Sequence, residues 1–135
     1  MKMDGLEIVK EKNKVYAIII GKEFNQPGIN FFTPEEFSQQ LGILIHKKGK
    51  KVNRHRHKLI PRKITRTQEV LLIVEGKLKV DLFNDEGKAL KSVVMTSGST
   101  ILLARGGHSI EIQEDSKIIE VKQGPYAGYD DKEFF

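Results

Sequence analysis

The chain has 135 residues, no cysteine and a formal net charge of +5 at pH 7. This length suits one domain with its own core, and the lack of cysteine excludes disulfides, thiolate metal sites and a cysteine nucleophile. The basic balance favours anionic partners, and we expect a small anionic molecule rather than nucleic acid because the sequence has no Trp and no recognisable nucleic-acid-binding module.

A membrane partner is not expected either. The longest apolar run, residues 15–20, is too short to cross a bilayer, and no apolar leader follows the first methionine. Together with the absent cysteines, this predicts a soluble cytoplasmic protein.

The apolar residues alternate with polar ones along most of the chain, and Gly, Asn, Asp and Lys clusters interrupt them at short intervals. This pattern predicts an all-β domain of antiparallel strands with little helix. The only helical turn expected is at 33–37, where Thr33 can cap and Pro34 suits the first position. Turn residues at 75–77, 84–87 and 96–99 predict hairpins. The predicted strands are 7–9, 15–20, 40–46, 70–74, 78–83, 89–95, 100–104, 108–112 and 117–122.

No linker or repeat divides the sequence, so we expect one domain over residues 1–135. It comprises an N-terminal arm with strands (1–40), a barrel (41–124) and a C-terminal tail (125–135) that folds back only if its two final phenylalanines find a groove. The apolar run 15–20 could serve as an exposed edge strand, swapped or added to a partner sheet, and on that basis we expect a homodimer.

Three histidines and one glutamate are candidate metal ligands. His55 and His57 are two residues apart, so on a strand both imidazoles point to the same face. Glu69 begins an apolar strand that ends at Gly76, and His108 follows the later run that starts at Gly98. If neighbouring strands bring these side chains together, four donors surround one point.

The spacing of these residues resembles the two motifs of the cupin family. Gly49 to His57 and Glu69 to Gly76 look like the first motif, and Gly98 to His108 is similar to the second. The resemblance implies a double-stranded β-helix, or jelly-roll, barrel in which His55, His57, Glu69 and His108 bind one metal ion at the barrel mouth. The sequence departs from the family in a long insertion, 58–68, and in an early His108, which a bulge or turn at Gly106-Gly107 would correct.

Imidazole and carboxylate donors suit several divalent transition metals, and we expect Fe, Mn, Ni or Zn. Three histidines and one carboxylate would leave two positions open on an octahedral ion, which favours chemistry. The insertion carries Arg62 and Arg66 without an acidic residue, and guanidinium groups recognise carboxylates and phosphates. Arg105, beside the Gly106-Gly107 turn, and Tyr126, in the tail, are further candidates for substrate binding.

Three functions fit these residues. The first is a metal-dependent enzyme, such as an isomerase or oxygenase, that acts on an organic acid or sugar derivative. The second is a non-catalytic module that binds a sugar or an acid. The third is a metal-free barrel resembling sugar epimerases, with a histidine and a tyrosine as base and acid. The tail's Gly-Pro-Tyr is similar to the ends of small cupins of surface-carbohydrate metabolism, and no catalytic residue is assigned.

Overall fold

The computed structural model describes residues 2–135, and 49% of the chain is β-strand. No α-helix occurs in this range, and the one helical element is a 3-10 turn, η1 (Gly128–Asp131). No helix in the described part of the chain is long and apolar enough to cross a membrane. The strands are β1 (Lys2–Met3), β2 (Leu6–Glu11), β3 (Lys14–Ile20), β4 (Gly28–Phe31), β5 (Gly42–Ile45), β6 (Glu69–Phe83), β7 (Ala89–Thr96), β8 (Thr100–Leu103) and β9 (Gly107–Lys122).

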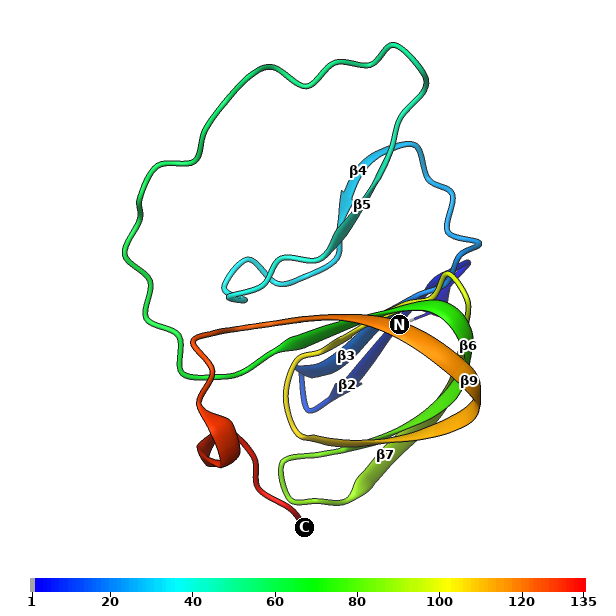
Figure 1. The fold of residues 1–135 in the computed structure, drawn as a ribbon, viewed down its shortest axis with the longest axis vertical. Helices are drawn as coiled ribbons and strands as arrows, with labels where there is room; N and C mark the ends of the chain where they lie inside the picture. The colour runs from blue at the N-terminus through cyan, green and yellow to red at the C-terminus, as the bar shows by residue number, and fades with distance from the viewer. Residues whose placement is uncertain (1) are drawn as a thin grey trace. The chain divides into compact units, whose positions relative to one another are not determined.

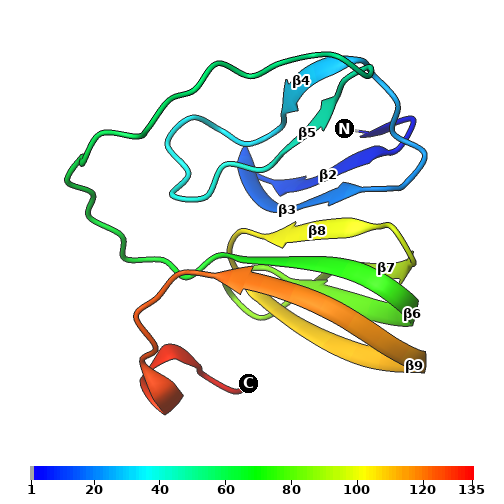
Figure 2. The same cartoon turned by 45° about the horizontal axis from the view of Figure 1, so that its top comes forward.

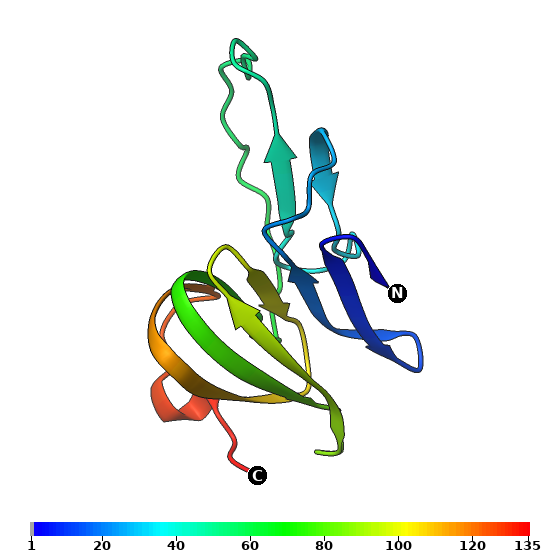
Figure 3. The ribbon, with the colours of Figure 1, turned by 90° about the vertical axis from the view of Figure 1, so that its right-hand side faces the viewer.

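The chain divides into two compact units, and the larger one comprises residues 1–24 and 66–135. Its single antiparallel sheet has the order β1-β2-β3-β8-β6-β7, with β9 paired along β6 (Figure 1). Figure 2 shows β2, β3, β8 and β6 following one another across this sheet. The long strands β6 and β9 curl together into a half-barrel (Figure 3). The expected all-β, barrel-like architecture is therefore confirmed.

The hydrophobic core lies on the concave face of this curled sheet. Alternate residues of β6, among them Leu78, Val80 and Leu82, are buried because a strand turns every second side chain to the same face. The facing residues of β9 share that face, since Ile112 pairs with Leu78 and Ile110 with Val80. These two isoleucines remain 53% and 40% exposed, so the concave face is open along β9.

The second unit covers residues 25–65. Its ordered centre is the hairpin of β4 and β5, in which Gly28 pairs with Ile45 and Phe31 with Gly42. β4 was not predicted from the sequence because its four residues carry only two apolar positions beyond glycine. At 33–37 the expected helical turn is a single turn closed by the Phe37 N–H and the Pro34 carbonyl at 3.1 Å, without a helix.

The turns predicted at 84–87 and 96–99 are confirmed, and the one predicted at 75–77 is wrong. The Gly87 N–H donates to the Asn84 carbonyl at 3.0 Å, and the Ser99 N–H donates to the Thr96 carbonyl at 3.1 Å. By contrast, β6 runs unbroken through Gly76, which has a φ of +105°. The register of β6 against β9 shifts around this point. Gly76 therefore bends a continuous strand at a bulge and does not reverse the chain.

The run 15–20 is not an edge strand. It lies in β3, which pairs with β2 on one side and with β8 on the other, so its backbone cannot join a partner sheet. Within residues 2–135, β9 pairs with β6 alone and leaves its other edge open along 16 residues. The homodimer stays a prediction, but the run 15–20 no longer supports it.

The C-terminal tail does fold back onto the barrel. The ring of Phe135 meets that of Phe83 edge to face, with the ring centroids 5.4 Å apart. Phe135 also lies against Gly107, where an added Cβ would clash with its ring, and near Gly87, where a Cβ would meet the ring at an ordinary contact distance of 3.4 Å. Nearer the start of β6, the Thr67 hydroxyl donates to the Asp131 carboxylate at 2.6 Å. Contacts of Phe135 and of Asp131 thus hold the tail against the rest of the larger unit.

Candidate metal centre

Two of the four predicted ligands, Glu69 and His108, lie together on the concave face of the larger unit. Glu69 starts β6, whereas His108 pairs with Leu82 at the far end of the same strand. A straight strand would separate Glu69 from Leu82 by roughly 40 Å, at about 3.3 Å per residue. The side chains nevertheless approach to 3.9 Å between His108 Nε2 and Glu69 Oε2. The curl of the sheet therefore brings the two ends of β6 to one place.

Gly106 determines the direction in which His108 points. Its φ of +71° is a left-handed conformation that glycine adopts without strain. The chain bends at Arg105 and Gly106, and β9 then begins at Gly107 with His108 on the core side. The expected bend before His108 is thus present, and His108 shares the face of Leu82, with which it pairs.

Burial makes both side chains of this pair favour their neutral forms. The pKa of His108 lies below its usual range mainly because the ring is buried, although the negative charge of Glu120 opposes this shift. The pKa of Glu69 is raised by burial, by a hydrogen bond with Glu120 and by the charge of Glu120. Lys122 and Lys132 act in the opposite direction on Glu69. Burial is therefore the largest cause of both shifts. A neutral imidazole is also the form that binds a metal ion.

Three charged residues near this pair were not predicted from the sequence. Glu120 and Lys122 lie on β9, where Lys122 pairs directly with Glu69 and Glu120 with Leu71. Lys132 comes from the tail, close enough for its charge to influence both Glu69 and His108. Alternation could not have found them, because it sets the polar Glu120 and Lys122 opposite the apolar Ile119 and Val121, whereas the register with β6 places them on the face of Ile118.

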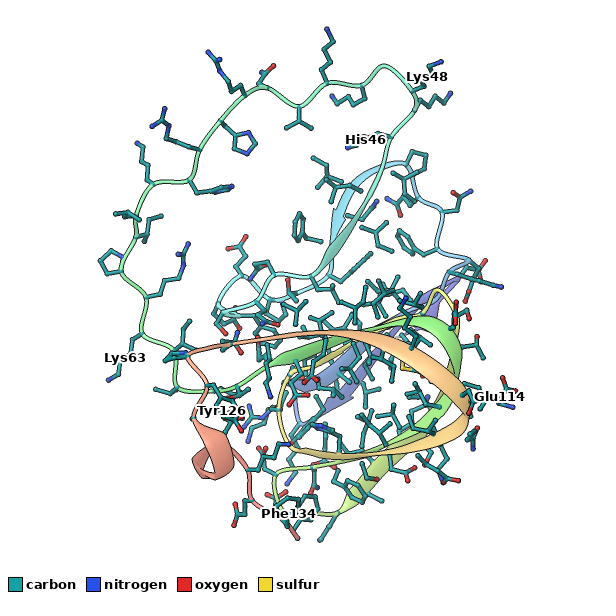
Figure 4. All side chains as sticks on the ribbon, viewed as in Figure 1. His46, Lys48, Lys63, Glu114, Tyr126 and Phe134 are labelled. Carbon is teal, nitrogen blue, oxygen red and sulfur yellow. The ribbon has the colours of Figure 1, made fainter. Side chains whose placement is uncertain are left out.

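The other two predicted ligands, His55 and His57, lie together in the second unit. Their rings meet edge to face with centroids 5.3 Å apart, and His55 Nδ1 is 2.7 Å from the Asn53 carbonyl oxygen. The expected strand is absent here, since residues 46–66 form no strand and all are exposed. Figure 4 shows side chains projecting from this extended segment between Lys48 and Lys63. A strand needs the backbone of a neighbouring strand as a hydrogen-bonding partner, and in the described chain no strand pairs with residues 46–66.

The structure thus presents the four predicted ligands as two pairs, one in each unit. Among the residues that it describes, no group of three or more His, Cys, Asp or Glu side chains converges on one point. The Glu69–His108 pair offers one carboxylate and one imidazole, and the His55–His57 pair offers two imidazoles. Both donor types suit the transition metals expected from the sequence.

The candidate substrate residues are spread over the chain. Arg62 and Arg66 are exposed on the segment that follows His57, and Tyr126 is 88% exposed. Arg105 donates from Nη2 to Asp85 Oδ2 at 2.7 Å and lies over the ring of Tyr16. Its charge is therefore engaged within the fold, and substrate binding by all four residues stays a prediction.

The Arg105–Asp85 pair predicts a pH-dependent contribution to stability. The pKa of Asp85 is lowered mainly by its hydrogen bond with Arg105. A depressed folded-state pKa stabilises the protein above the unfolded-state value of about 4 and ceases to do so as the pH falls through the folded-state value. We expect Asp85→Asn to lower the free energy of unfolding by about 1 kcal/mol at neutral pH and to have no such effect in acid. Urea denaturation at the two pH values measures this, and an equal loss at both would contradict it.

Comparison of the whole chain with protein-family models, with curated proteins and with solved structures found no match.

Proposed function

We propose that this protein is a metal-binding cupin that holds one divalent ion on His55, His57, Glu69 and His108. The observation that supports this most directly is the approach of Glu69 and His108 on the concave face. These residues come from the two segments that resemble the cupin motifs. Glu69 lies at the start of β6 and His108 pairs with Leu82 near its end, yet Glu69 Oε2 and His108 Nε2 are 3.9 Å apart. The curl that makes the half-barrel also makes this pair.

His55 and His57 supply the remaining ligands in this proposal. They are already neighbours, and both are exposed and therefore accessible to an ion. The chain between His57 and Glu69, residues 58–68, can extend over roughly 35–40 Å at 3.3–3.6 Å per residue. The insertion that departs from the family pattern thus gives the two histidines the reach to meet Glu69 and His108.

The proposed ligand set suits Fe, Mn, Ni or Zn, and an octahedral ion would keep two positions for a substrate or oxygen. Such an ion would serve as a Lewis acid or oxygen-binding centre, which fits an isomerase or an oxygenase. Lys122 and Lys132 place positive charge next to Glu69, and this favours an anionic substrate such as an organic acid or an acidic sugar derivative.

Elemental analysis of the purified protein tests the proposal. We expect close to one transition-metal ion per chain, and loss of that ion in the double variant His55→Ala/His57→Ala. His46→Ala is the matched control, because His46 is an exposed histidine of the same unit outside the motif, and it should retain the metal. If the wild-type protein binds no metal even after reconstitution with Fe, Mn, Ni and Zn, the proposal is wrong.

A further inference from the structure

Residues 46–66, here called the basic segment, concentrate the positive charge of the protein. They hold ten of the 23 basic side chains and none of the 18 acidic ones, so the segment carries +10 and the remaining residues sum to −5. The net charge of +5 for the whole chain does not reveal this separation. All residues of the segment are exposed, and its basic side chains are Lys47, Lys48, Lys50, Lys51, Arg54, Arg56, Lys58, Arg62, Lys63 and Arg66.

The charges of the basic segment are not used by the fold. In the part of the chain that the structure describes, no ion pair includes one of these ten side chains, and the ion pairs present all lie in the larger unit. Like charges repel one another and keep a chain extended, and Figure 4 shows the extended course of the segment between Lys48 and Lys63. The ten charges are therefore available to an anionic partner.

Four exposed aliphatic side chains lie between these charges and indicate which partner fits. Val52, Leu59, Ile60 and Ile64 are between 46% and 101% exposed. The phosphate backbone of a nucleic acid offers them no apolar contact, and the segment has no Phe, Tyr or Trp to stack on bases. A membrane surface uses both features, because anionic headgroups attract lysine and arginine while the acyl boundary accepts aliphatic groups.

From these observations we propose that the basic segment binds the surface of a membrane that contains anionic lipids. Its lysines and arginines lie among the headgroups, and Leu59 and Ile60 enter the boundary between headgroups and acyl chains. The expectation of no membrane partner concerned segments that cross the bilayer, and a segment that lies on the surface need not cross it. The rest of the chain, at −5, adds no attraction, so the segment accounts for the binding. This inference goes beyond the metal centre and does not depend on it.

Flotation of the protein with lipid vesicles tests the inference, in the presence of EDTA so that no metal ion takes part. Vesicles of mixed phosphatidylcholine and phosphatidylserine should bind the protein, whereas vesicles of phosphatidylcholine alone should not. Added salt should release the protein from the mixed vesicles, because salt screens the attraction between exposed charges.

The double variant Lys50→Ala/Lys51→Ala measures the contribution of charge. A basic residue near an anionic surface strengthens binding by about fivefold, so we expect the partition coefficient to fall by about 25-fold. Lys10→Ala/Lys88→Ala is the matched control, because it removes two exposed lysines from the larger unit, and it should bind as the wild type does.

The double variant Leu59→Ser/Ile60→Ser measures the apolar contribution. We expect it to bind the mixed vesicles about tenfold more weakly, because two aliphatic side chains no longer leave water. Ile119→Ser/Val121→Ser removes two exposed aliphatic side chains from β9 and should have no such effect. Because the basic segment is exposed and forms no strand, its variants should match the wild type in thermal unfolding.

Three other results would overturn the inference. The wild-type protein could fail to bind the mixed vesicles, or bind both kinds of vesicle equally. Equal losses in the two lysine variants would show that the basic segment is not the binding site. If Leu59→Ser/Ile60→Ser binds the mixed vesicles as the wild type does and duplex DNA displaces the protein from them, the segment is a nucleic-acid site instead. None of these results bears on the metal centre, which elemental analysis tests separately.

Discussion

Replacement of Gly106 with alanine is expected to lower the free energy of unfolding by about 2–5 kcal/mol. A left-handed conformation costs an L-residue about 1–2 kcal/mol, and Gly106 has a φ of +71°. An added Cβ would also lie 2.8 Å from Tyr16 Cδ1 and closer still to the Phe83 carbonyl oxygen, and such overpacking adds about 1–3 kcal/mol. The carbonyl belongs to the backbone and cannot rotate away, so the bend before His108 must shift.

Gly128→Ala is the control for the backbone term alone. Gly128 has a similar φ of +63°, but a Cβ there would meet nothing within 4 Å. We therefore expect a loss of only about 1–2 kcal/mol for Gly128→Ala in chemical denaturation. Equal losses in the two variants would show that the contact with Phe83 does not matter. The comparison bears on function as well, because Gly106 directs His108 to the concave face.

Most of the strands and the two confirmed turns could be predicted because they depend on local chemistry. Alternation fixes which side chains of 78–83 face the core, and Asn84 and Gly98 occur where the chain must turn. The error at Gly76 has a non-local cause. A glycine within Glu-Gly-Lys reads as a hairpin, yet β9 pairs with β6 on both sides of Gly76 and keeps the strand continuous. Sequence alone does not show which strand will be the neighbour.

The same reasoning explains what was predicted of the candidate site. The motif spacing selected Glu69 and His108, and the curl of the sheet placed them together. Glu120 was not selected because it belongs to neither motif, and its contact with Glu69 depends on the register between β6 and β9. His55 and His57 were expected on a strand, and strand formation depends on a backbone partner that the sequence does not identify.

Binding of the proposed metal ion is expected to protect the segment 46–66 from trypsin by about 100-fold when the free metal is at 100 times its dissociation constant. At that concentration a ligand stabilises the bound form by about 2.7 kcal/mol, and cleavage follows the population of the open form when opening is fast. The segment offers many cleavage sites, because it is exposed throughout and contains Lys58, Arg62 and Lys63. The metal-free protein should therefore be cut there rapidly.

Mass spectrometry of the fragments shows where and how fast the chain is cut. In His55→Ala/His57→Ala the metal should give no protection, because the segment no longer contributes ligands, while His46→Ala should behave as the wild type. A protein that binds metal but is cleaved at the metal-free rate would assign the ion to Glu69 and His108 without the two motif histidines. Protection that is lost in the double variant would instead mean that His55 and His57 take part in binding the ion.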